Sequence, residues 1–185
     1  MTFVEECEEL SIEESMDRWR DPQMNAPDVL VRFAEEAGTP LVPDSDGSGL
    51  SVGESEVRHE VVRDAGGRTL VVQEYHRGAP PRTVLRTDDP EVVWRFLALV
   101  IATVWRSRHG LDVLVLAKDE LPSGYEVVPT GPRRVLLRWA SGSADELREY
   151  QARHLAHACA HTLDEVVAAV RHPTGWPVSS DEPAP

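Results

Sequence analysis

The stretch DDPEVVWRFLALVIATVWRSRHG, residues 88–110, constrains the fold of this chain more than any other segment. Asp88 or Asp89 can cap the start of a helix, Pro90 suits its first turn, and Gly110 can end it. Two neighbouring apolar stripes run along this predicted helix: Val93, Leu97, Val100 and Val104, and beside them Trp94, Ala98, Ile101 and Trp105. A helix that is apolar over most of its circumference must be covered on more than one side. We therefore expect a central core helix, with a β-sheet on one side and another helix on the other.

The chain carries a large negative charge. Its formal net charge is −13 over 185 residues, and its isoelectric point is near 4.9. This argues against nucleic acid as a partner, because phosphates attract basic surfaces. An acidic surface favours a basic protein partner, although it also serves solubility alone. The start of the chain has no basic and apolar signal sequence, and the helix over 88–110 is too short and too interrupted by arginine to span a bilayer. We expect a cytoplasmic protein with no membrane partner.

Composition divides the chain into three parts. Residues 1–26 contain eight acidic residues and two arginines, with apolar residues too sparse for a core. We expect an acidic N-terminal arm that is flexible or forms one short helix. Residues 27–172 have the apolar content of one domain, and residues 173–185, with four prolines, are expected to be a disordered tail.

Alternating apolar residues and turn signals predict an antiparallel β meander. The predicted strands are 57–63, 68–77, 83–86, 111–116, 125–128 and 134–140, with a short extended segment at 41–43. Helices are predicted over 27–37 and from 143 to 171, where Ser143 and Glu146 have the spacing of a capping box. The result is a single α+β domain, in which the sheet packs against the central apolar helix and a long C-terminal helix.

Motifs for catalysis and cofactors do not stand out. The loop DSDGSG at 44–49 begins like a calcium loop but lacks the later ligands and the closing glutamate, so we interpret it as a turn. The sequence has neither a GxGxxG fingerprint nor a GxSxG elbow, and no phosphate loop. We expect a protein that is not an enzyme and needs no cofactor.

Three histidines near the C-terminus are the most suggestive candidates for metal binding. His154, His157 and His161 fall along one face of the predicted last helix, and the spacing of His157 and His161 suits two zinc ligands. That face is opposite the apolar stripe, so a solvent-facing surface is the simpler interpretation, and we predict no physiological metal site. Cys159 lies on the apolar stripe and is expected to be inert, and a disulfide with Cys7 is unsupported by their surroundings.

Two segments combine aromatic and arginine side chains beside predicted turns: Glu74–Arg77 and Trp105–His109. Such side chains often form the energetic centre of protein interfaces. The alternative is that they are ordinary ends of a strand and a helix, with arginines lying along the surface.

The order of these features resembles that of the immunity proteins, or antitoxins, of tuberculosis necrotizing toxin (TNT)-type toxins. The resemblance covers residues 28–172. Its segments are DVLVRFAEEAG with LVPDSDG, EVRHEVVRDAGGRTLVVQEYHRG, TDDPEVVWRFLALVIATVWRSRHGLDVL, LPSGYEVVP and HACAHTLDEVVAAV. The family implies a partner that is a toxin with NAD glycohydrolase activity, inhibited when the antitoxin blocks its active site.

We therefore expect an immunity protein that binds the catalytic domain of a secreted toxin. The candidate interface residues are Asp44, Asp46, Glu74, Tyr75, Arg106 and His109. The alternative is a cytoplasmic chaperone or adaptor for a secreted substrate, which would hold an unfolded segment instead of a folded enzyme. A metal enzyme built on His157 and His161 is the third hypothesis, and it requires stoichiometric zinc.

Overall fold

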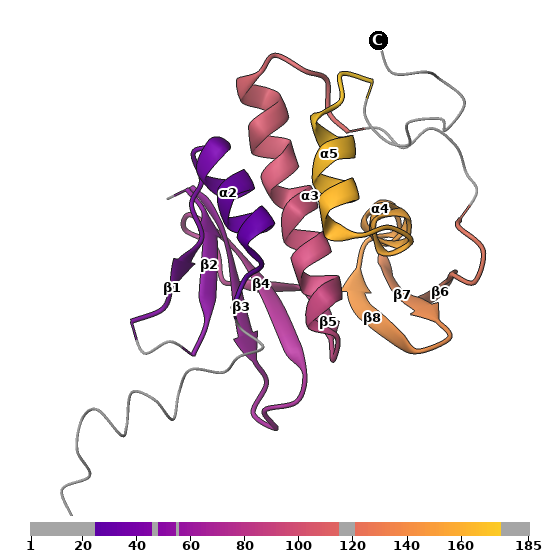
Figure 1. The fold of residues 1–185 in the computed structure, drawn as a ribbon. Helices are drawn as coiled ribbons and strands as arrows, with labels where there is room; N and C mark the ends of the chain where they lie inside the picture. The colour runs from indigo at the N-terminus through magenta and orange to yellow at the C-terminus, as the bar shows by residue number, and fades with distance from the viewer. Residues whose placement is uncertain (1–24, 46–47, 55, 115–120, 175–185) are drawn as a thin grey trace, which may run out of the picture.

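The computed structural model describes residues 25–45, 48–54, 56–114 and 121–174 (Figure 1). In these residues the chain forms an eight-stranded sheet and four helices, which confirms the α+β prediction. The strands are β1 (Val42–Pro43), β2 (Leu50–Gly53), β3 (Val57–Arg63), β4 (Leu70–His76), β5 (Arg82–Thr87), β6 (Glu126–Gly131), β7 (Arg134–Trp139) and β8 (Gly142–Leu147). The helices are α2 (Asp28–Glu36), α3 (Pro90–Arg108), α4 (Glu149–Cys159) and α5 (Leu163–Arg171).

Strands β1 to β5 form an antiparallel meander whose register follows the apolar alternation. In the β3–β4 hairpin, Val61 pairs with Val72 and His59 pairs with Glu74, so these four side chains share one face. The turn is built by Asp64, whose carboxylate accepts hydrogen bonds from the backbone N–H groups of Arg68 and Thr69. This hairpin lies where the sequence predicts it.

The sheet continues through β8 to β7 and β6, in the order β1-β2-β3-β4-β5-β8-β7-β6. The junction between β5 and β8 is narrow: Arg86 pairs with Asp145, and the Thr87 hydroxyl donates to the carbonyl of Ser143. The prediction that Ser143 and Glu146 open a helix is therefore wrong. Ala144 and Leu147, both 0% exposed, face the core, and the segment completes the sheet instead.

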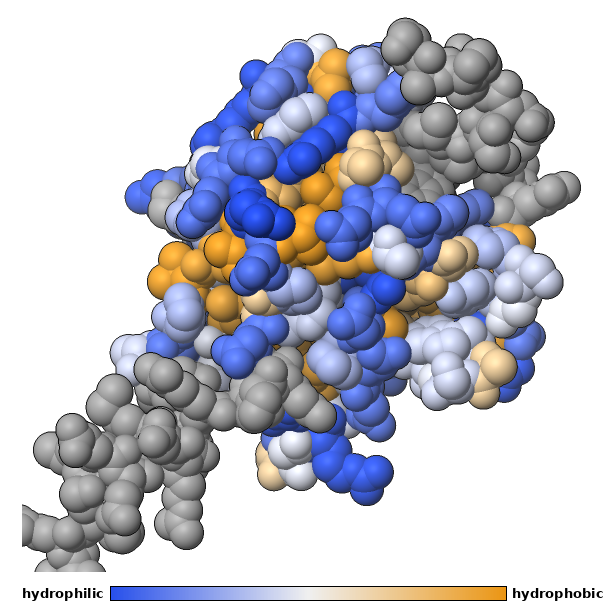
Figure 2. Space-filling model, viewed as in Figure 1, coloured by the Kyte–Doolittle hydropathy of each residue, from blue (hydrophilic) through white to orange (hydrophobic). Residues whose placement is uncertain are grey.

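Helix α3 is the centre of the core, as predicted. Asp89 caps it through a hydrogen bond from the N–H of Glu91, and Pro90 occupies its first turn. Val93, Leu97 and Ile101 are each 0% exposed. Helices α2 and α5 pack beside α3, which itself crosses the sheet from β5 to β2 (Figure 1). On the face drawn in Figure 2, apolar side chains gather in a band across the middle, bordered by polar ones.

The predicted long C-terminal helix is two helices. Helix α4 ends at Cys159, and Thr162 starts α5 with a capping box in which its hydroxyl accepts from the N–H of Glu165 and its own N–H donates to the Glu165 carboxylate. The prediction of a single helix is wrong because this cap satisfies the free backbone N–H groups at the start of α5, where the chain turns. In the described part of the chain, no helix is both long and apolar enough to cross a membrane.

The predicted strand over 111–116 is also absent where the structure describes it. Residues 111–114 form no strand, and Val113 is 75% exposed. Arg106 holds this segment by donating to the carbonyl of Asp112, beside the end of α3. Residues 115–116, most of the acidic arm and most of the tail lie outside the described residues.

Candidate functional site

An open groove of about 640 Å³ lies between α3, the end of the β2–β3 hairpin and the start of α4. Its floor is the sheet, where Val52, Val57 and His59 come from two adjacent strands. Helix α3 forms one wall and Tyr150 of α4 contributes to another. The α3 residues that line the groove are Phe96, Leu99, Val100, Ile101, Thr103, Val104, Ser107 and Arg108. The groove therefore joins three segments that are far apart in the sequence.

The groove carries exposed apolar side chains. The large apolar residues that are exposed in the described part of the chain are Val42, Val57, Val113 and Tyr150. Val57, 39% exposed, and Tyr150, 54% exposed, both line the groove. Leu99 and Val100 are only partly buried beside them. These exposed apolar side chains from different elements therefore line one groove, where a partner could cover them.

A polar cluster lies at one side of the groove floor, centred on Glu74. Its carboxylate forms an ion pair with Arg82, lies 3.2 Å from Nε2 of His76 and lies 3.6 Å from Nε2 of His59. The Glu74 side chain is 14% exposed, while that of Arg82 is 38% exposed. The His59 and Phe96 rings pack in an edge-to-face arrangement, with ring centroids 6.4 Å apart.

These contacts set the charges in the cluster. Burial acts to raise the pKa of Glu74, but Arg82 and the two histidines outweigh it and lower the pKa below 4.5. Burial lowers the pKa of His59 below 6.5, although the Glu74 carboxylate opposes that change. At neutral pH the cluster therefore contains an ionised Glu74 and a neutral His59.

The C-terminal histidines do not form the predicted single face. His154 lines the groove, and burial together with His157 lowers its pKa below 6.5. This corrects the expectation of a solvent-facing row. His157 lies in α4, whereas His161 lies in the turn before α5, 3.7 Å from the Glu165 carboxylate. In the ranges that the structure describes, no group of three or more His, Cys, Asp or Glu side chains is arranged to hold a metal ion.

Cys159 is a poor candidate for reactivity. It packs against the core, and burial raises the pKa of its thiol to about 12. A thiol with that pKa is protonated at physiological pH, so it is a weak nucleophile.

The predicted interface residues do not gather at one place. Glu74 lies in the groove. Tyr75 follows it on the strand and therefore points to the opposite face of the sheet, where its hydroxyl donates to the Gln73 side chain at 2.8 Å and the Arg58 guanidinium lies 5.0 Å from its ring centroid. The Asp44 carboxylate is near enough to act on the pKa of Tyr75, and Asp46 lies outside the described residues.

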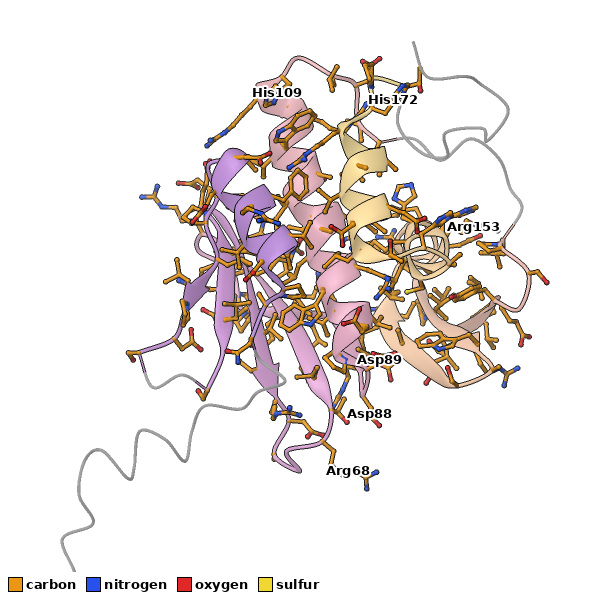
Figure 3. All side chains as sticks on the ribbon, viewed as in Figure 1. Arg68, Asp88, Asp89, His109, Arg153 and His172 are labelled. Carbon is orange, nitrogen blue, oxygen red and sulfur yellow. The ribbon has the colours of Figure 1, made fainter. Side chains whose placement is uncertain are left out.

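Arg106 and His109 lie at the C-terminal end of α3. Arg106 is 2% exposed and donates to four backbone carbonyls, those of Asp112, Val170, His172 and Pro173. Its guanidinium thus joins α3 to the end of α5. His109 is exposed and stacks on Trp105, with ring centroids 4.0 Å apart. It lies at the opposite end of α3 from Asp88 and Asp89 (Figure 3).

Sequence reasoning missed the groove itself. Val57 and Tyr150, its most exposed apolar residues, were not among the predicted interface residues. The sequence did contain one indication of the groove, the wide apolar surface of the helix over 88–110. Val100 and Val104 on that helix stay partly exposed even though the sheet and the neighbouring helices pack against it.

The chain is similar to known proteins in its sequence pattern and in its fold. The sequence model of a protein family described as Immunity protein 61 (Imm61) matches residues 33–178. No curated protein matches this sequence. The fold is similar to the solved structure of Rv3902c from M. tuberculosis, with 17% sequence identity and a TM-score of 0.69 over 83% of this chain and 93% of that chain. At this identity, the likeness shows a shared fold.

Proposed function

This chain belongs to the Immunity protein 61 family, and from that premise we propose that it is an immunity protein that binds and neutralises a protein toxin. The family match is the observation that carries the proposal. It spans residues 33–178 and so includes every described residue that lines the groove, from Thr39 to His154. Family membership also favours inhibition by binding over catalysis.

We propose further that the toxin is an NAD glycohydrolase of the tuberculosis necrotizing toxin type. The support is the sequence resemblance over residues 28–172 described above. Inhibition would then be steric: the bound immunity protein covers the catalytic cleft and keeps NAD out. Such an inhibitor acts where the toxin would otherwise consume NAD, so we place it in the cytoplasm.

The net charge of −13 gives this encounter its electrostatic component. Asp44, Asp46 and Glu74 would contribute negative potential toward basic residues that a toxin needs for the pyrophosphate of NAD. His109 would offer aromatic contact surface at the end of α3. Tyr75 lies on the face of the sheet opposite Glu74, so it would contact the toxin only if the toxin also reached that face. Arg106 is buried, so we assign it the indirect role of fixing the end of α3 that carries His109.

A second candidate function is a chaperone or adaptor for a secreted protein. The open apolar groove favours it, because a groove of this kind can also hold an unfolded segment. The two functions differ in the state of the partner. An immunity protein holds a folded toxin, whereas a chaperone holds an unfolded chain.

The test is co-expression with a candidate toxin domain from a neighbouring gene. We expect the toxin alone to deplete cellular NAD and stop growth, and the pair to restore both. The complex should be one to one, and its toxin partner should resist limited proteolysis as a folded domain does. A rescued cell whose purified partner is unfolded would favour the chaperone, and rescue from a toxin that leaves NAD intact would overturn the NAD glycohydrolase assignment alone.

A further inference from the structure

We propose that the groove between α3, the β2–β3 hairpin and α4 is the docking site for one particular kind of toxin segment: an aliphatic or aromatic side chain flanked by a lysine or arginine. This inference rests on the proposed function, since it takes the partner to be a toxin. It adds which surface binds, and what chemistry the toxin must present there.

The apolar half of the requirement comes from the walls of the groove. Val57 and Tyr150 stand on different elements and are 39% and 54% exposed, with the partly buried Leu99 and Val100 lining the groove as well. An apolar side chain that enters this space covers surface that water now contacts, which is favourable by roughly 25 cal/mol for each Å² removed from water. The volume of about 640 Å³ lies within the roughly 300–1,000 Å³ typical of pockets that bury most of a ligand, so the groove has room for more than one side chain.

The basic half comes from the acidic residues of the same groove. Glu54 and Glu56 line it with side chains that are 61% and 62% exposed. Glu74 adds a third carboxylate on the floor, but it is 14% exposed and already paired with Arg82. Glu54 is bridged to Arg108 and Glu56 to Arg77, in both cases at the surface. Surface ion pairs contribute only about 0–1 kcal/mol, so an incoming cation can replace either arginine at small cost. The net charge of −13 attracts a cationic segment and repels an acidic one.

The same charge argues against a second copy of this chain as the occupant, because two such molecules repel each other. Self-association through the groove is therefore an outcome that would contradict the proposal. Light scattering of the free protein, before the toxin is added, shows whether this chain self-associates.

The first experiment compares two exposed valines, Val57 inside the groove and Val113 outside it. Val57→Lys and Val57→Glu put opposite charges into the groove, and Val113→Lys and Val113→Glu put them on an exposed site that does not line it. Affinity for the adjacent toxin domain is measured by calorimetry, and unfolding curves check that each variant is folded. We expect Val57→Lys to weaken binding at least about tenfold, Val57→Glu to weaken it less, and both Val113 variants to bind like the unchanged protein.

The outcomes separate this inference from the proposed function. If both Val57 variants bind the toxin with unchanged affinity, the groove is not the docking site, but the proposed immunity function is unaffected. If Val57→Glu lowers the affinity as much as Val57→Lys or more, the bound toxin segment does not carry the proposed lysine or arginine. The absence of any complex with the unchanged protein overturns the proposed function, and this inference falls with it.

A second experiment identifies the occupant directly. A photo-crosslinking phenylalanine analogue at position 57 is compared with the same residue at position 113, and the joined toxin peptide is read by mass spectrometry. We expect crosslinking from position 57 only, to a peptide in which an apolar residue lies within a few positions of a lysine or arginine. Crosslinking from position 113 alone, or to an acidic peptide, contradicts the proposal.

Discussion

Replacing Arg106 with methionine should destabilise this protein far more than the same change two residues later. Arg106 is 2% exposed, and its guanidinium binds four carbonyls, at 2.7 Å to Asp112, 3.0 Å to Val170, 2.8 Å to His172 and 3.0 Å to Pro173. Arg106→Met keeps an unbranched side chain of similar length but removes every donor. The bond to Val170 is buried, and the other three are partly buried.

The magnitude follows from these environments. A hydrogen bond from a charged donor contributes about 1.5–3 kcal/mol, and the buried carbonyl of Val170 loses its bond from this donor. The three partly buried carbonyls can regain water, so each costs about 0.5–1 kcal/mol. We expect the free energy of unfolding to fall by about 3–6 kcal/mol, which lowers Tm by roughly 6–24 °C for a chain of this size.

The assay is urea unfolding followed by tryptophan fluorescence, with Arg108→Met as the matched control. Arg108 lies on the same helix but is 47% exposed at its side chain and bridges to Glu54 at 3.1 Å, so its replacement should cost no more than about 1 kcal/mol. If the two variants lose equal stability, the argument that Arg106 joins α3 to the end of α5 is wrong.

Four further predictions concern the turn before α5, the buried histidines, Glu74 and the Cys159 thiol. Thr162→Ala removes the cap of α5 and should lower the free energy of unfolding by about 1 kcal/mol in urea unfolding; an unchanged midpoint would contradict the capping role. Burial lowers the pKa values of His59 and His154 in the folded protein, so the unfolded chain binds more protons between those values and pH 6.5. The free energy of unfolding should therefore fall as the pH drops below 6.5. His59→Gln and His154→Gln should each reduce that fall in unfolding curves recorded at several pH values. Glu74, with its pKa below 4.5, adds a second loss of stability below pH 4.5, which Glu74→Gln should remove. The Cys159 thiol, with its pKa raised to about 12, should react with iodoacetamide at pH 8 far more slowly in the folded protein than in urea, as measured on its own peptide by mass spectrometry; equal rates would show that it is not protected.

The parts of the fold that the sequence predicts are those specified locally. The β3–β4 hairpin follows from Asp64 and Gly67 between two alternating runs, and α3 follows from Asp89, Pro90 and its apolar content. In each case the residues that form the element also mark its ends, so no distant contact is needed to place it.

The parts that the sequence mispredicts depend on distant partners. Residues 142–147 contain Ala144, Asp145 and Glu146, which favour a helix start, and they become β8 because β7 on one side and β5 on the other offer pairing edges. Glu146 even adopts a φ of 66°, which a helix would not accept. The break before α5 was readable, since Thr162 and Glu165 have the spacing of a capping box.

The groove could not be predicted from any one segment. Val57 belongs to a strand and Leu99 to the central helix. Tyr150 belongs to α4, whose start was predicted too early in the sequence. Only the packing of α3 against the β2–β3 hairpin and α4 brings these side chains around one space. The predicted interface residues came instead from local composition, and the structure spreads those that it describes over both faces of the sheet and the end of α3.

A titration of toxin activity measures most directly whether this protein inhibits a toxin by binding it. A purified candidate toxin domain from a neighbouring gene is held at a concentration far above the expected dissociation constant, and the protein is added stepwise. We predict that toxin activity falls in a straight line and ends at one equivalent, with a one-to-one complex on size-exclusion chromatography. Full toxin activity at several equivalents, with the two proteins eluting separately, would contradict it.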